Sequence, residues 1–257
     1  MIQIFPDQES LGSGAARLFV RQAGLALKAR GRFSVALSGG HTSRRTYELL
    51  AQSPFRDQVA WSQTHVFWSD ERCVPPEDPR SNARIARLLL LEHLPIPRDQ
   101  IHPIRCNGSP KKAAREYEDL LRSFFGEGPP RLDLIFLGLG GDGHTASLFP
   151  QTPVLKEEAR WAAEIYLPQQ DLYRVTLTPA IINQTAVVAF LVAGAAKAPT
   201  LKEVLEGPRD PHRYPAQLIH PSSGHLQWLV DKEAASQLSR ALLRAGSEPA
   251  VSEVGQK

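Results

Sequence analysis

Short apolar runs alternate along the chain with longer stretches in which apolar residues recur every three or four positions. The runs are rich in Val, Ile, Leu and Phe, which is typical of strands; they lie at 32–37, 65–68, 132–137, 186–192 and 225–230. The longer stretches carry the periodicity of helices; they extend from after Gly40 to Leu50 and over 81–91, 111–125, 197–205 and 231–243. A further strand is expected to begin near residue 2.

This alternation predicts the class of fold. Strands that alternate with helices favour a parallel sheet with helices on both faces. The strands are nearly continuous in apolar residues, as expected where a sheet is buried on both sides. No repeat or change of composition marks a boundary, and the Pro-rich stretches are short enough to be loops. We therefore predict a single α/β domain over residues 1–257, built on an open, mainly parallel sheet, with about the last ten residues disordered.

Composition narrows the choice of partners. The chain has 30 Lys and Arg against 27 Asp and Glu, so its net charge of +3 is small, and the two signs are mixed. A nucleic-acid binder usually gathers its cations on one face or in one run. We therefore expect no nucleic acid, and a small anionic ligand remains open. The longest apolar run, 186–196, is far shorter than the roughly 20 residues of a membrane span, so no membrane association is expected.

The two cysteines and the first residues indicate a compartment. Cys73 and Cys106 form neither a CxxC pair nor a disulfide framework, which suits a reducing compartment. Residues 1–10 lack the basic and apolar regions of a signal peptide. We expect a cytoplasmic protein without a disulfide bond.

Three polar clusters follow strands directly, at 38–40, 70–72 and 140–144. Ligands of open α/β sheets bind beyond the carboxyl ends of the strands. The three clusters are therefore expected to meet in one crevice, which would be the active site.

The first cluster, followed by His41 and Thr42, joins a strand to a helix. Gly39 and Gly40 would let the backbone approach a ligand, and the helix N-terminus would add partial positive charge. A phosphate cradle is one interpretation, and a simple tight turn is the other. The loop lacks the Lys of a P-loop and the glycine spacing of a dinucleotide site, which disfavours a nucleotide.

The most informative stretch is GLGGDGHTASLFP at 138–150. Histidine exchanges protons near neutral pH, and a carboxylate beside it can fix its tautomer. His144 and Asp142 lie two residues apart in this glycine-rich loop, which favours a catalytic role over a surface position. In the second cluster, Asp70 could act as a base or an orienting group and Arg72 could bind phosphate or carboxylate, although a solvated turn is commoner.

Other chemistries find less support. The eight histidines show no HExxH pattern and no zinc spacing with cysteine, so no metal is expected. There is no GxSxG nucleophile elbow. His144 therefore favours direct activation of water over covalent catalysis. Arg174 and Lys197 could reach the same crevice as cations, although isolated residues of these types are usually solvated.

Together these motifs resemble the 6-phosphogluconolactonases, within the family they share with the glucosamine-6-phosphate isomerases. The resemblance covers most of the chain, and the run at 142–150 is its most specific part. Ser43 departs from the proline common in the family, which would affect rigidity more than chemistry. The matching motifs lie at 36–42, 69–74, 81–82, 142–150, 174–178, 192–197, 214–216 and 228–231.

The resemblance implies a Rossmann-like fold similar to glucosamine-6-phosphate deaminase, and hydrolysis of 6-phospho-D-glucono-1,5-lactone in the oxidative pentose phosphate pathway. His144 would deprotonate the attacking water, and Asp142 or Asp70 would orient His144 or hold sugar hydroxyls. Arg72 would contact the phosphate or the sugar acid end. No metal or cofactor is implied, and we expect a monomer or weak homo-oligomer. The phosphate would be held by Gly39, Gly40, Thr42, Arg174 and Lys197.

Two other functions remain as alternatives. A deaminase or isomerase on the same scaffold would continue from DGH toward an Asn-Glu-Pro segment, where this chain has Ser-Leu-Phe-Pro at 147–150. A non-catalytic sugar-phosphate sensor would need a fused DNA-binding segment, for which the sequence ahead of the loop at 38–42 has no room.

Overall fold

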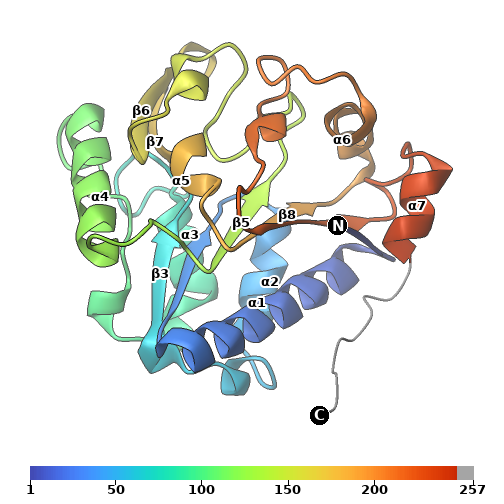
Figure 1. Ribbon diagram of the computed structural model, residues 1–257. Helices are drawn as coiled ribbons and strands as arrows, with labels where there is room; N and C mark the ends of the chain where they lie inside the picture. Colours follow the sequence, from blue (N-terminus) through green and yellow to red (C-terminus); the bar gives the residue numbers. More distant parts are fainter. Residues whose placement is uncertain (248–257) are drawn as a thin grey trace.

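Six parallel strands form the central sheet in the computed structural model, which describes residues 1–247 (Figure 1). They run in the order β1-β9-β8-β5-β2-β3. The five apolar runs all form strands of this sheet, and the prediction of an open, mainly parallel sheet is confirmed. The predicted C-terminal disorder lies outside the described residues. The strands are β1 (Ile2–Phe5), β2 (Phe33–Leu37), β3 (Thr64–Trp68), β5 (Leu134–Gly138), β8 (Val187–Val192) and β9 (His225–Asp231).

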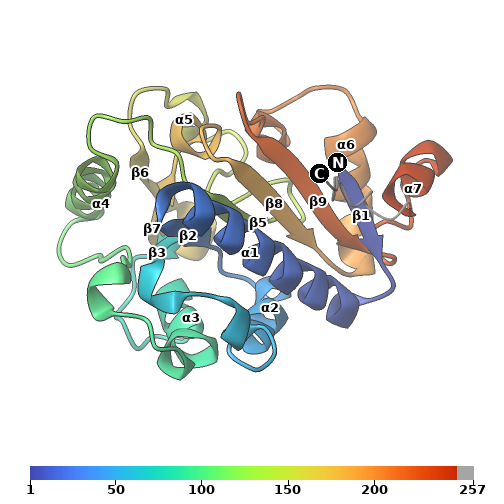
Figure 2. The same cartoon turned by 60° about the horizontal axis from the view of Figure 1, so that its bottom comes forward.

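The central strands are apolar because both faces of the sheet are covered. Every residue of β2 and β8 is buried. Phe190 and Trp228 are paired across β8 and β9, and their rings stack with centroids 4.0 Å apart. Figures 1 and 2 show α1 and α2 on one face, and α5, α6 and a second, smaller sheet on the other.

Helices occupy the stretches that the periodicity predicted, with one exception, whereas the long helix at 8–30 and the short one at 179–182 were not predicted. Several begin at side chains that accept a backbone N–H: Asp7 caps α1, Ser81 caps α3 and Ser109 caps α4. The helices are α1 (Gln8–Arg30), α2 (Thr42–Leu50), α3 (Asn82–Leu89), α4 (Pro110–Phe125), α5 (Pro179–Ile182), α6 (Ala198–Glu206) and α7 (Arg240–Ser247).

The helix predicted over 231–243 is wrong in its first half. Asp231 ends β9, and its carboxylate accepts N–H groups from Gly194 and Ala234 at 2.8–3.1 Å. This short polar side chain therefore turns the chain instead of starting a helix. The last helix, α7, begins only at Arg240.

The second sheet is antiparallel and was not predicted. Its order is β4 (Asp70–Arg72), β7 (Leu172–Leu177) and β6 (Ala162–Leu167). The charged triplet at 70–72 is thus itself a short strand, and it brings Arg72 opposite Arg174 in the register. Helix α4 packs against β6 and β7. The second sheet places two predicted site residues side by side.

The direction of the strand order changes between β2 and β5. From β2 the chain continues outward to β3, whereas β5 lies on the other side of β2. Such a switch point opens a crevice at the carboxyl ends of its two strands. The glycine loop after β2 and the DGH loop after β5 both emerge there.

Cys73 and Cys106 form a disulfide, so the prediction of a chain without one is wrong. The residues are 33 positions apart in sequence, and their Cα atoms are 5.1 Å apart. The pairing could not be inferred from spacing, because it depends on β4 lying beside the segment that precedes α4.

Two histidines outside the switch point should make stability depend on pH. His65 Nδ1 and His102 Nε2 lie 3.2 Å apart, and Phe67 stacks on His102. Burial, followed by the charge of His65, lowers the pKa of His102 to about 4 from 6.5. The unfolded chain then binds more protons than the native state below pH 6.5, so stability is complete above that pH and is lost as the pH falls toward 4.

We expect His102→Gln to weaken this acid sensitivity by about 1–2 kcal/mol, less than the full shift implies because the half-buried ring is screened by water. The measurement is the free energy of unfolding in urea at pH 7 and pH 5. His220→Gln, at an exposed position, is the control. Equal pH dependence in both variants would contradict the assignment.

Candidate active site

A cavity of about 320 Å³ lies at the switch point between β2 and β5. All three predicted polar clusters reach this cavity, as expected from their positions directly after strands of a parallel sheet. Asp142 is the one predicted site residue that does not line the cavity, and it is hydrogen-bonded to His144, which does. The predicted residues that line it are Gly39, Gly40, Thr42, Asp70, Arg72, His144, Arg174 and Lys197.

The glycine loop is fixed by two side chains of α2. The buried Tyr47 hydroxyl accepts the Ser38 N–H at 3.1 Å and donates to the Ser38 carbonyl oxygen at 2.6 Å. The Ser43 hydroxyl lies 3.2–3.3 Å from the carbonyl oxygens of Ser38, Gly39 and Gly40 and can donate to one at a time. Ser43 thus ties the loop down by a hydrogen bond in the position where the family commonly has proline.

The loop also requires glycine. A Cβ on Gly39 would overlap the side-chain oxygen of Asn82. Gly40 has φ +96°, which other residues rarely adopt. Helix α2 then begins at Thr42 without a side-chain cap, so the first N–H groups of the helix have no side-chain acceptor and are free to bind an anion. These features fit an anion-binding loop better than a simple turn.

His144 and Asp142 form a hydrogen-bonded pair in the loop after β5. His144 Nδ1 lies 2.5 Å from Asp142 Oδ1, which also accepts the His144 backbone N–H at 3.1 Å. Burial would raise the pKa of Asp142, but hydrogen bonds from His144 outweigh it and the pKa is lowered. An ionised carboxylate at Nδ1 favours the tautomer with its proton there, which leaves Nε2 as the proton acceptor.

The ring of His144 has a defined position. It stacks on Phe149 with centroids 4.0 Å apart. The loop closes beneath it, because the Gly140 N–H donates to the His144 carbonyl oxygen at 2.8 Å. Gly140 must be glycine, since a Cβ there would overlap His144 Nδ1 and lie 2.6 Å from Asp142 Oδ1. Glycine at position 140 therefore leaves space for the His144–Asp142 pair.

Asp70 belongs to a different network. Its carboxylate accepts the Ser147 hydroxyl at 2.6 Å and the Asn82 amide at 3.1 Å, and lies 3.7 Å from Arg174 Nη1. Among residues 1–247, Asp142 is the carboxylate that hydrogen-bonds the His144 ring. Of the two carboxylates that could orient His144, the geometry therefore favours Asp142.

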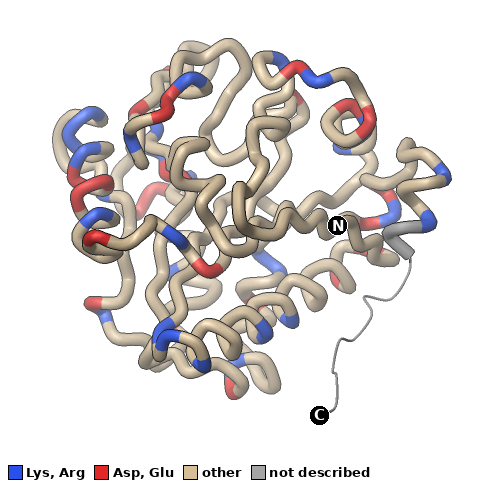
Figure 3. Tube along the Cα trace, viewed as in Figure 1, with Lys and Arg blue, Asp and Glu red and all other residues tan. Residues whose placement is uncertain are grey.

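Three cations face the cavity from different elements. Arg174, on β7, is buried; burial lowers its pKa, and Asp70 partly offsets this. The Arg72 guanidinium donates to the Arg80 carbonyl oxygen at 2.6 Å. Lys197 precedes α6 directly. Elsewhere cations and anions are interspersed along the chain, as the sequence predicted (Figure 3).

Sequence reasoning did not assign roles to three residues of the site. Gln8 lines the cavity from α1, and its amide lies 3.4 Å from His41 Nδ1. Asn82 and Ser147 hold Asp70 in place. Asn82 and Ser147 lie within recognised motifs, so their spacing carried a signal, whereas nothing in the sequence connected Gln8 with the glycine loop.

Within residues 1–247, no group of three or more His, Cys, Asp and Glu side chains is arranged to hold a metal ion. In the same range no helix is long and apolar enough to cross a membrane.

Fold and site together define an α/β protein with a glycine-rich loop and a hydrogen-bonded His–Asp pair at one switch point. The family model for glucosamine-6-phosphate isomerases and 6-phosphogluconolactonase matches residues 6–228, and the chain belongs to this family.

Similar proteins of known name agree with this assignment. A 6-phosphogluconolactonase of Nostoc sp. is 39% identical over 243 residues, which cover 93% of this chain and 98% of the relative. One of Synechocystis sp. is 43% identical, over 83% and 88% of the two chains. The solved structure of 6-phosphogluconolactonase from Trypanosoma brucei has a TM-score of 0.81 at 29% identity and covers 93% of this chain and 98% of its own.

Proposed function

We propose that this protein hydrolyses 6-phospho-D-glucono-1,5-lactone to 6-phospho-D-gluconate in the oxidative pentose phosphate pathway. The observation that carries the proposal is the hydrogen-bonded His144–Asp142 pair, which faces a glycine loop across one cavity. Two relatives that are 39% and 43% identical to this chain, both named 6-phosphogluconolactonase, indicate which substrate is hydrolysed.

The phosphate of the lactone would bind at the glycine loop. The N–H groups of the loop and of the first turn of α2, which begins at Thr42, suit phosphate oxygens. Arg174 and Lys197 would balance its charge from the facing elements. Arg174 is suited to this because it is buried, and a buried cation gains most from an anionic partner. Arg72 would contact the phosphate or the sugar acid end.

His144 would act as the general base. Its Nε2 would take a proton from a water molecule, which attacks the lactone carbonyl carbon. The oxyanion that forms requires nearby donors, which N–H groups of the glycine-rich loop after β5 would provide. The protonated ring would then give its proton to the departing ring oxygen. Asp142 would stabilise the imidazolium and hold the ring in place throughout.

The reaction can be separated from that of the related deaminases. The monomeric glucosamine-6-phosphate deaminase among the structural neighbours has a TM-score of 0.78 but is 21% identical, so it shows a shared fold. This chain has Ser147 and Phe149 in the stretch where deaminases continue toward Asn-Glu-Pro. Both side chains are engaged in the site, Ser147 with Asp70 and Phe149 with the His144 ring.

We expect the purified protein to hydrolyse freshly prepared 6-phospho-D-glucono-1,5-lactone and to release no ammonia from glucosamine 6-phosphate. Because such lactones also open spontaneously, the rate without protein must be subtracted. Ammonia release without lactone hydrolysis would show that the protein is a deaminase. Substrate binding without turnover would show that it is a non-catalytic sugar-phosphate sensor.

Location and assembly remain predictions from the sequence, namely a cytoplasmic protein that is a monomer or weak homo-oligomer. A relative from Oryza sativa, 38% identical over 92% of this chain, is named as chloroplastic. The disulfide removes one of the arguments for a reducing compartment.

A further inference from the structure

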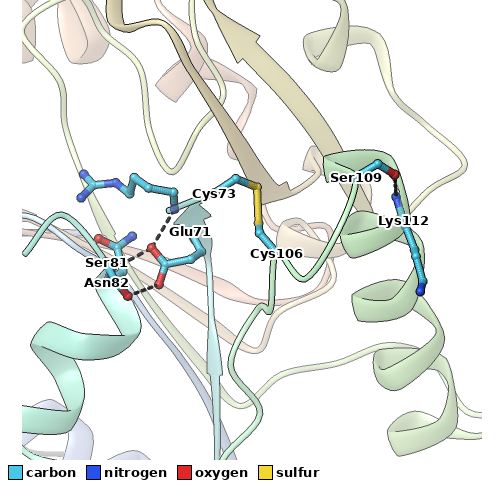
Figure 4. The surroundings of a disulfide bond; sticks show 8 residues. Glu71, Cys73, Ser81, Asn82, Cys106, Ser109 and Lys112 are labelled. Carbon is cyan, nitrogen blue, oxygen red and sulfur yellow. Dashed lines mark hydrogen bonds between the residues drawn. A yellow bond between two sulfur atoms is a disulfide. The ribbon is translucent and has the colours of Figure 1, made fainter. Parts of the chain in front are cut away.

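The disulfide lies beside the substrate cavity but outside it. Figure 4 shows Cys73 at the end of β4, bonded to Cys106 in the segment that leads to α4. Both cysteines are half-buried and line a separate groove of about 1130 Å³. Arg72 lines this groove and the substrate cavity alike. The disulfide is therefore one residue away from a side chain of the site.

On one side, the disulfide fastens a segment with few other attachments. His102 donates its N–H to Val66, and Ser109 caps α4. Between these points, within residues 1–247, no hydrogen bond joins residues 103–108 to the rest of the protein. Ile104 is buried, and Cys106 supplies the covalent link. Without that link, packing of Ile104 and Cys106 against the core would be the contact that holds the segment.

On the other side, the disulfide attaches to a network that positions the site. The buried Glu71 carboxylate accepts N–H groups from Arg72, Asn82 and Ala83 and the Ser81 hydroxyl at 2.7–3.0 Å. Figure 4 shows Glu71 beside Ser81 and Asn82. The same Asn82 contacts Asp70 and leaves room only for glycine at position 39. A movement of β4 would therefore displace Arg72 before the other residues of the site.

The groove also suits thiol–disulfide exchange. Thiol–disulfide exchange requires that a thiolate of the reductant reach a sulfur atom of the disulfide. Arg105 and Asn107, on either side of Cys106, are exposed, so a reductant can approach the disulfide from that segment.

We propose that Cys73–Cys106 is a redox modification site that takes a dithiol reductant and controls the placement of Arg72. One thiolate of the reductant attacks a sulfur of the pair and releases the other as a thiolate, which takes up a proton. The second thiol of the reductant then loses its proton and attacks the reductant's own sulfur in the mixed disulfide, which closes the disulfide of the reductant and releases the remaining cysteine as a thiolate that takes up the proton. Two cysteine thiols and one oxidised dithiol result, with two electrons transferred. The effect on catalysis rests on the proposed lactonase function; the redox site does not.

The experiment compares the air-oxidised protein with the protein reduced by dithiothreitol and alkylated. Mass spectrometry should find no free thiol before reduction and two after it. Hydrogen exchange should become faster in peptides covering 70–74 and 103–108. The KM for the lactone should rise about three- to tenfold, less than loss of Arg72 would cause, because the guanidinium is displaced and not removed. The Cys73→Ser/Cys106→Ser double variant should have the KM and the exchange rates of the reduced protein, and dithiothreitol should change neither.

Each outcome bears on one of the two proposals. Two free thiols in the air-oxidised protein, or a disulfide that resists dithiothreitol in the folded state, would overturn the redox site. Faster exchange with an unchanged KM would overturn the control of Arg72. Faster exchange in a protein without lactonase activity would support the redox site and refute the proposed function. Circular dichroism of the double variant separates these results from unfolding.

Discussion

Replacement of His144 by Ala is expected to lower kcat on the lactone by about 10²–10⁴, the usual contribution of a general acid–base group. The ring lies on Phe149 and its Nδ1 is held by Asp142, so Nε2 is the atom left to accept a proton. The glycine loop, where the phosphate is proposed to bind, follows a different strand, β2, so binding of 6-phospho-D-gluconate should change little. Stopped assays on fresh lactone, corrected for spontaneous opening, measure the effect.

His220→Ala is the control, since His220 is exposed and lies outside the cavity. A His144→Ala variant that keeps its kcat would refute the role of general base. A variant that loses kcat together with product binding would indicate that His144 serves to hold the substrate.

Gly140→Ala is expected to lower kcat by about 10²-fold, the scale of the loss when catalytic groups are misplaced by about 1 Å. A Cβ at this position would overlap His144 Nδ1 and press on the Asp142 carboxylate, so the pair would have to separate. Glycine is needed here for space, since Gly140 is not among the residues with positive φ. The measurement is kcat together with the pH profile of kcat, which should broaden or shift when Asp142 no longer contacts the ring.

Gly141→Ala is a closely matched control, because a Cβ on the next residue of the same loop would have no atom within 4 Å. Both variants make the loop less flexible in the same way. Equal losses in the two would mean that loop flexibility matters and the geometry of the pair does not.

Much of the fold could be predicted because the central sheet is buried on both faces. Strands such as β2 and β8 are continuous apolar runs, and helices such as α4 carry a clear period and a capping Ser109. The helix expected from Asp231 onward failed because a single carboxylate captured two backbone N–H groups, an interaction with Gly194 that lies far away in sequence.

The small antiparallel sheet was missed for a related reason. Its strand β4 consists of Asp70, Glu71 and Arg72, whose charges indicate a solvated turn. Only the pairing with β7, together with the hydrogen bonds that Glu71 accepts, makes burial of these groups favourable. Charged residues in a strand cannot be distinguished from a turn until their partners are known.

The sequence by itself determined the class of fold, the place of the site at the strand ends, and the residues that gather there. These follow from local patterns, since periodicity sets the elements and parallel strands end at one edge. The tertiary structure decided what depends on pairs distant in sequence. It placed Asp70 against Ser147 and Arg174, which left Asp142 as the partner of His144, and it joined Cys73 to Cys106. A contact between residues many positions apart depends on how the elements pack, and no spacing along the chain encodes it.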